Sequence, residues 1–297
     1  MERPRAEDRR PDAPAKIPPR GWWTVLRRAT RDVARHRVLD EAGGVAFFAL
    51  LALGPALAAL VSFYGLFADP AAVAKHLAAL AAVAPDDGVR LVGDHVRRLA
   101  AGDRDTLGFG AAGGVAAALW SMNRAVRVLV RGLNRIYGGH EARGFLARTA
   151  RTLTLTLGGV LFALLASGAV VVVPLTPRFL GLGGAVDLLL RFLRWPLLLA
   201  ATTVLLAYLH RYGPCRARPR WRWVSWGGAF AAVAWLLGSA ALSWYVGDLG
   251  ESGKTYGPLG AAIGLMTWLW LSAAVVLVGA ALNAAMEREA GRVPGGA

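Results

Sequence analysis

Long apolar runs separated by short polar segments dominate the pattern of this sequence. A run of about 20 apolar residues is long enough to cross the ~30 Å hydrocarbon layer of a membrane as a helix. The pattern therefore predicts an all-α, polytopic membrane protein with six transmembrane helices and short amphipathic interfacial helices. The predicted spans cover residues 42–67, 106–126, 152–173, 186–209, 224–246 and 256–284. They form one membrane domain over residues 21–290, between a disordered cytoplasmic tail at 1–20 and a cytoplasmic tail at 291–297.

Two segments outside these spans also carry apolar residues at helical spacing. Residues 22–39 combine Trp, Val and Leu with five arginines, a mixture typical of a helix that lies on an anionic membrane surface. A solvated linker before the first span is the alternative interpretation. Between residues 68 and 105, the helical spacing is interrupted at Pro85, which predicts two short amphipathic helices on the outer face.

Composition and charge support a membrane protein and set its orientation. Of the 297 residues, 56% are hydrophobic and 18% are charged, whereas soluble domains carry about 25% charged residues. The net charge of +15 would indicate nucleic-acid binding in a soluble chain, but cytoplasmic loops of membrane proteins also collect Lys and Arg. Of the 34 Lys and Arg residues, 25 lie in segments 1–41, 121–151, 210–223 and 285–297, and seven lie in segments 68–105, 174–187 and 247–255. The split predicts that both termini are cytoplasmic and that the chain has no nucleic-acid partner.

The sequence contains no pattern that predicts a metal centre or a bound cofactor. Cys215 is the single cysteine, and the five histidines are scattered without metal-ligand spacing. We therefore expect no catalytic residue, no metal ligand and no cofactor. Membrane lipids with anionic headgroups are the expected partners.

The sharpest local feature is a row of four arginines at the end of the second predicted span. Arg124, Arg127, Arg131 and Arg135, here called the arginine row, fall within an arc of about 80° on a helix, opposite an apolar face. Because a guanidinium binds phosphate through two parallel hydrogen bonds, the row is a candidate phosphate site, with Asn134 as a further candidate ligand-binding residue. The alternative is that the arginines only anchor lipid headgroups and fix the topology.

Two further features concern helix geometry. Gly54 and Pro55 lie in the middle of the first predicted span, where a proline removes one backbone hydrogen bond and kinks the helix. Such breaks occur at transporter substrate sites and also in ordinary membrane helices. Asn283, near the end of the last span, is expected to form an interhelical hydrogen bond or to face the headgroups.

Five motifs occur in order along nearly the whole chain: Ala46–Pro55, Trp120–Ser121, Leu133–Tyr137, Tyr256–Gly260 and Leu277–Asn283. Together they resemble the YihY/BrkB family of bacterial inner-membrane proteins. The residues that carry the resemblance include Trp120, Tyr137, Tyr256, Gly257, Gly279 and Asn283. The resemblance implies six transmembrane helices, cytoplasmic termini and an inner-membrane location.

The chain departs from the family pattern at three places. Members often show a Tyr pair where this chain has Phe47-Phe48, a serine near Ala52, and a glutamate where this chain has Ala281. If that glutamate couples transport to ions in the family, the same coupling is not expected here.

The resemblance links the chain to the bacterial envelope without fixing a biochemical activity. Members have been connected with envelope integrity, serum resistance and lipid-related export, and an old label calls them ribonuclease BN. A metal-dependent nuclease needs clustered carboxylates or histidines, but the predicted spans contain almost no acidic residues. We therefore expect a transporter or flippase-like protein for an anionic or lipid-linked envelope component. The alternative is a non-transporting membrane scaffold that binds anionic lipid.

Overall fold

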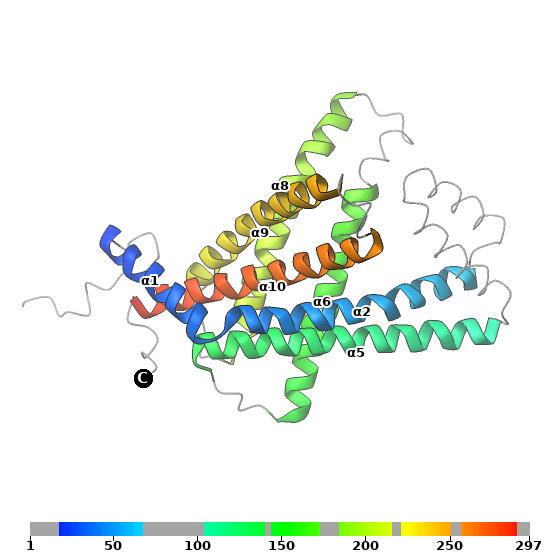
Figure 1. Ribbon diagram of the computed structural model, residues 1–297, viewed down its shortest axis with the longest axis horizontal. Helices are drawn as coiled ribbons and strands as arrows, with labels where there is room; N and C mark the ends of the chain where they lie inside the picture. Colours follow the sequence, from blue (N-terminus) through cyan, green and yellow to red (C-terminus); the bar gives the residue numbers. More distant parts are fainter. Residues whose placement is uncertain are drawn as a thin grey trace, which may run out of the picture. The chain divides into compact units, whose positions relative to one another are not determined.

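The computed structural model describes residues 18–67, 104–139, 144–172, 184–215, 221–250 and 257–289. Regular structure within these ranges is entirely helical, which confirms the all-α prediction. The helices are α1 (Pro19–Arg35), α2 (Val38–Phe67), α5 (Arg104–Tyr137), α6 (Phe145–Val172), α8 (Gly184–Tyr212), α9 (Trp221–Gly250) and α10 (Gly257–Glu289). Figure 1 shows them as long rods. Both predicted tails, the two helices expected between 68 and 105, and Tyr256 lie wholly or largely outside the described residues.

Four of these helices are long and apolar enough to cross a membrane: Val38–Leu60, Phe145–Ala166, Trp226–Tyr245 and Ala262–Glu289. The predicted spans at 106–126 and 186–209 are helical as well. The number of six spans is not confirmed, since the described part of the chain supplies four candidates. In α5 the clean apolar run, residues 107–119, is shorter than the ~20 residues that a span needs.

The surface of the candidate spans matches a lipid environment better than water. On α6, four leucines at positions 157, 161, 164 and 165 are each more than half exposed. Large apolar side chains exposed in such density are disfavoured in water. A hydrocarbon solvent removes that cost, so the exposed leucines support a membrane location.

Hydroxyl groups within the spans form hydrogen bonds to their own helices. The side chains of Thr154, Thr156, Thr203 and Thr267 each donate to the carbonyl four residues earlier, at 2.7–3.0 Å. In a bilayer, a polar group without a partner costs several kcal/mol. These hydroxyls are therefore satisfied within the helix that carries them.

The described residues divide into two compact units. One unit comprises residues 48–124 and the other comprises residues 1–47 and 125–297, so α2 and α5 each contribute to both. In the first unit, α2 and α5 approach closely beside Pro55. A Cβ atom added at Gly114 would lie 2.9 Å from the carbonyl oxygen of Pro55 and 3.0 Å from the Cβ of Ala59. The small residue at 114 thus permits this contact.

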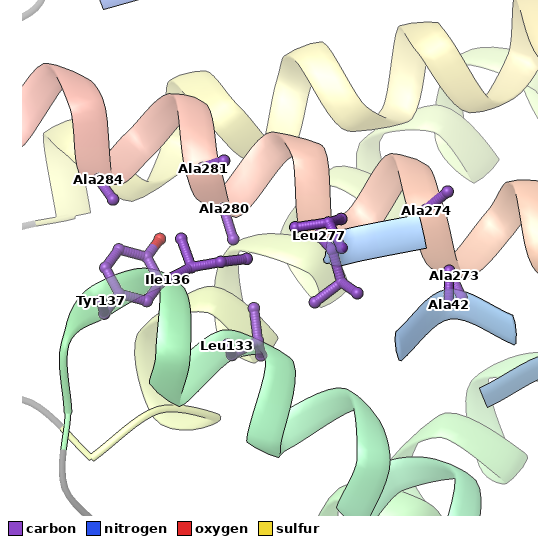
Figure 2. Close-up of a cluster of buried hydrophobic side chains, with 11 residues drawn as sticks. Ala42, Leu133, Ile136, Tyr137, Ala273, Ala274, Leu277, Ala280, Ala281 and Ala284 are labelled. Atoms are coloured by element: carbon purple, nitrogen blue, oxygen red, sulfur yellow. The ribbon is translucent and has the colours of Figure 1, made fainter. Parts of the chain in front are cut away.

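The core of the second unit surrounds the last turns of α10. Side chains from α5, among them Leu133 and Ile136, face Leu277 and Ala280 of α10, as Figure 2 shows. The buried residues of this part of α10 are Leu277 and all of residues 279–287. We call this segment, residues 276–289, the hub. It is covered by protein, whereas Ile263, Leu265 and Met266, nearer the start of α10, are exposed.

Two neighbouring helices, α9 and α10, are joined by a reciprocal pair of hydrogen bonds. Trp235 of α9 donates from Nε1 to the Oγ atom of Ser272 at 2.8 Å, and Trp268 of α10 donates to Ser239 at 3.1 Å. The two tryptophan rings lie 5.8 Å apart between their centroids. Each indole N–H, which is costly to leave unpaired in a membrane, thus finds a hydroxyl on the facing helix.

Candidate functional site

The arginine row lies on α5 as the sequence predicts. On the opposite side of the helix, Ala125, Leu133 and Ile136 are buried. Arg124, Arg131 and Arg135 are exposed, and Arg127 is half-buried. Val128 lies about 20° beyond Arg135, just outside the arc of the row, and is buried. A Cβ atom at Gly44 of α2 would lie 3.2 Å from a methyl group of Val128.

Neighbouring groups contact three of the four arginines. Arg135 forms an ion pair with Glu41 of α2. Arg127 donates from Nη2 to Oγ1 of Thr149 on α6, at 3.4 Å. The guanidinium of Arg124 stacks on the ring of Trp120 one turn earlier, 4.9 Å from the ring centroid.

Arg131 lies on the exposed strip of α5 between the flank that α2 contacts and the flank that α6 contacts. Its neighbours along the row, Arg127 and Arg135, are oriented toward those two helices by their contacts. Two arginines of the row, Arg124 and Arg131, are exposed and form no ion pair with any residue in the described part of the chain.

Asn134 borders the row on the side of Arg127 but is not part of the exposed strip. It is buried, and its Oδ1 atom accepts a hydrogen bond from the backbone N–H of Cys215 at 2.7 Å. This bond attaches the residues after α8 to the end of α5. The amide oxygen of Asn134 therefore has a structural role in this conformation.

The end of α5 is closed by a Schellman motif. Gly138 has φ +66°, its N–H donates to the carbonyl of Arg135 at 3.2 Å, and the N–H of Gly139 donates to the carbonyl of Asn134 at 2.8 Å. Arg288 of α10 donates to the carbonyl of Ile136 at 2.7 Å. Sequence reasoning did not single out Arg288, because a lone arginine after an apolar run also suits a headgroup anchor.

Arg288 also joins α10 to α1. It forms an ion pair with Asp32, whose side chain is largely buried. His36 follows at the end of α1, and burial lowers its pKa below the ordinary value of 6.5. Asp32 opposes that shift, whereas Arg288, Arg35 and Arg135 add to it in this order.

Within the hub, one buried polar network connects α8, α9 and α10. The Oδ1 atom of Asn283 accepts from the backbone N–H of Gly227 at 2.9 Å, and its Nδ2 atom lies 3.4 Å from Nδ1 of His210. Nε2 of His210 lies 2.9 Å from the carbonyl oxygen of Val276. The carbonyl requires a donor, so Nε2 carries the proton and Nδ1 accepts from Asn283. Sequence reasoning missed His210, which stands alone at the end of an apolar run.

The remaining motif residues have separate locations. Gly279 and Asn283 meet in the hub, where both face α9. Tyr137 is buried in the hub core, and Trp120 is exposed. Gly257 is the first residue of α10. Gly54 is exposed beside Pro55 on α2.

The described residues also show whether any group of side chains could bind a metal ion. Among them, no three His, Cys, Asp or Glu side chains lie close enough to hold a metal ion. The two networks described above, around Asp32 and around His210, join helices to one another.

Comparison with known proteins identifies the family. The family model "Virulence factor BrkB" matches residues 29–296 of this chain. A curated relative, the ribonuclease-like protein YfkH of Bacillus subtilis (strain 168), is 27% identical over 263 residues, which covers 85% of this chain and 91% of the relative. No solved structure matches the chain. Because the family model extends over nearly the whole sequence, this chain belongs to the virulence factor BrkB family of membrane proteins.

Proposed function

We propose that this protein is an integral membrane protein that binds phosphate groups of anionic lipids or lipid-linked envelope components through the arginine row. The observation that carries the proposal is the exposure of Arg124 and Arg131 on one strip of α5, a helix whose opposite face is buried. A fixed helix with exposed guanidinium groups offers phosphate a preorganised partner.

The location of the arginine row at a helix end supports a lipid phosphate as the ligand. α5 carries the row in its last four turns, beyond its apolar run. An arginine just beyond the apolar part of a membrane helix is favourable when its guanidinium reaches the headgroup layer. The charge split along the sequence further supports an inner-membrane protein whose termini and arginine row face the cytoplasm.

Transport is a second candidate function, and Pro55 supports it. This residue lies inside α2 beside the exposed Gly54, where a Cβ atom would meet nothing within 4 Å. The helix is continuous through Pro55, but the missing backbone hydrogen bond and the free space beside Gly54 make this point a candidate hinge of a transporter or flippase. Transport of an anionic component begins with binding it, so both candidates share the phosphate contact.

We further propose that the protein is not a ribonuclease. The relative YfkH has a ribonuclease-like name. In this chain, the candidate site consists of arginines and helix-packing residues rather than clustered carboxylates.

The proposed binding is tested by measuring the affinity for phosphatidylglycerol and for phosphatidylcholine after reconstitution in nanodiscs. Arg124→Lys and Arg131→Lys keep the charge and remove the two-bond geometry. Hydrogen bonds to charged groups contribute about 1.5–3 kcal/mol, so each variant should bind phosphatidylglycerol about tenfold more weakly or worse. Arg135→Lys is the matched control, because Arg135 is already paired with Glu41. Equal affinities for the parent and all three variants would refute the proposal.

Transport is measured in the same preparation after transfer to vesicles. A fluorescent phosphatidylglycerol should move between the leaflets at a rate that Pro55→Ala lowers, if α2 moves as a hinge. Intact binding without any movement of lipid would leave the scaffold function and exclude transport of this lipid.

A further inference from the structure

We infer that one face of α1 docks onto the anionic surface of the membrane, as a second lipid contact separate from the arginine row. This outer face of α1 consists of Trp23, Leu26, Arg27, Thr30 and Arg31, all of which are exposed. Their spacing places them on one side of the helix.

The other side of α1 is fixed to the hub. Val25 and Ala29 are buried against three residues of α10, namely Leu282, Ala285 and Met286. Figure 1 shows α1 at the C-terminal end of α10. Two ion pairs add to this contact: Asp32 with Arg288, and Arg28 with Glu289 at 3.0 Å. The outer face of α1 thus has a fixed orientation relative to α10.

The apolar part of α1 is wider than its contact with α10. At 100° per residue, the buried Val25 and Ala29 are followed around the helix by Leu26 and then by Trp23. Leu26 is 50% exposed and Trp23 is 71% exposed. Arg27 and Arg31 follow beyond Trp23. This order, from apolar to basic around the circumference, is typical of helices that lie in a membrane interface.

The connection to α2 holds this face near the membrane. α1 ends at Arg35, and the candidate span of α2 begins at Val38. Tryptophan favours the interfacial layer because its ring is apolar and its N–H is polar. The hydroxyl of Thr30 lies 3.1 Å from the carbonyl oxygens of both Leu26 and Arg27, so it needs no partner from water.

Charge decides between a lipid surface and a second copy of the chain. In a symmetric pair of outer faces, each surface meets itself. Arg27 and Arg31 would then come close to the same two arginines of the other copy, which is unfavourable. An anionic lipid surface offers both of them the opposite charge. The outer face therefore fits anionic lipid better than it fits itself.

The test uses nitroxide labels on the full chain in vesicles. Cys215→Ser removes the single cysteine. It keeps the hydrogen bond to Asn134, because the backbone N–H of residue 215 is the donor. Labels are then attached at Leu26→Cys and, as a control, at Gly144→Cys, an exposed position where a Cβ atom meets nothing within 4 Å. Accessibility to oxygen and to a water-soluble nickel complex reports the depth of each label.

At position 26, the label should be several-fold less accessible to nickel than the label at 144, and deeper in vesicles with phosphatidylglycerol than in pure phosphatidylcholine. Arg27→Gln with Arg31→Gln should abolish the difference between the two lipid mixtures. Equal nickel accessibility at 26 and 144 in both mixtures would overturn the inference. Spin–spin coupling between labels at 26 on two copies would also overturn it, because the face would then be a dimer interface. These readouts do not involve α5, so they are independent of the proposed phosphate site.

Discussion

Gly279 lies where α10 crosses α9, at a contact that has no room for a side chain. A Cβ atom at this position would lie 2.8 Å from the carbonyl oxygen of Gly227, 2.9 Å from the Cβ of Ala231 and 3.3 Å from Cε1 of His210. The first two distances are well below van der Waals contact, and one of them involves the backbone. The Gly279→Ala variant must therefore push the two helices apart or distort the hub.

The expected loss of stability in Gly279→Ala follows from comparison with a matched substitution elsewhere. Exchanging glycine for alanine inside a helix stabilises it by about 1 kcal/mol, and this gain applies equally at Gly158 in α6, where a Cβ atom meets nothing within 4 Å. Overpacking costs about 1–3 kcal/mol and applies only at Gly279. The two alanine variants should therefore differ by about 1–3 kcal/mol, or about 2–12 °C in Tm at 2–4 °C per kcal/mol.

The measurement is thermal unfolding of both variants in the same nanodiscs at one heating rate. A Gly279→Ala variant as stable as Gly158→Ala would refute the close helix contact. The neighbouring Gly227 offers an independent test, because a Cβ atom there would overlap the side chain of Asn283. Gly227→Ala should destabilise less in an Asn283→Ala background than in the parent, which a double-mutant cycle measures.

Four further predictions concern the junction of α1, the topology and catalysis. Arg288→Gln removes the partner of a largely buried aspartate and a helix cap, so it should cost about 3–5 kcal/mol in unfolding experiments, whereas the exposed Arg31→Gln should change stability by less than about 0.5 kcal/mol. The pKa of His36 is lowered on folding, so stability present above pH 6.5 should decline as the pH falls below that value, and His36→Gln should flatten this decline. Reporter fusions after Tyr137 should be cytoplasmic and fusions after Gly250 should be external; the reverse result would contradict the charge count. Ribonuclease activity should not copurify with the protein, and activity abolished by mutation of one defined carboxylate would contradict the non-enzymatic interpretation.

The positions of the helices follow from the sequence better than the break between α1 and α2 does. The amphipathic segment 22–39 is helical, but α1 ends at Arg35, and α2 begins at Val38, four residues before the predicted span. No glycine or proline marks this break. Arg37 adopts φ +50°, a conformation uncommon for residues other than glycine. Before this bend, α1 packs on α10, a contact between segments about 250 residues apart that a local pattern does not contain.

The arginine row shows the same limit at the level of the site. Helical spacing alone predicts the shared face and the buried opposite side. It does not predict that Gly44 packs against Val128 beside the row, or that Glu41 and Thr149 contact two of the four arginines. These partners are separated from the row by tens of residues along the chain. For Asn283 the sequence left open an interhelical hydrogen bond or exposure to the headgroups; the structure shows the hydrogen bond, to Gly227 of α9, and places His210 next to it.

The polar residues of the spans bear on whether the protein is a transporter or a scaffold. In sequence they could line a water-filled path, which a transporter needs and a scaffold does not. In the structure, Ser239 and Ser272 accept from tryptophans on the facing helix, and Asn283 binds the backbone of α9. The threonines donate to their own helices. These groups form hydrogen bonds within or between helices, so a water-filled path would require breaking bonds that cost most in lipid. In this conformation the exposed arginines are the groups best placed for a ligand, which favours phosphate binding at the helix ends over a route through the described helices.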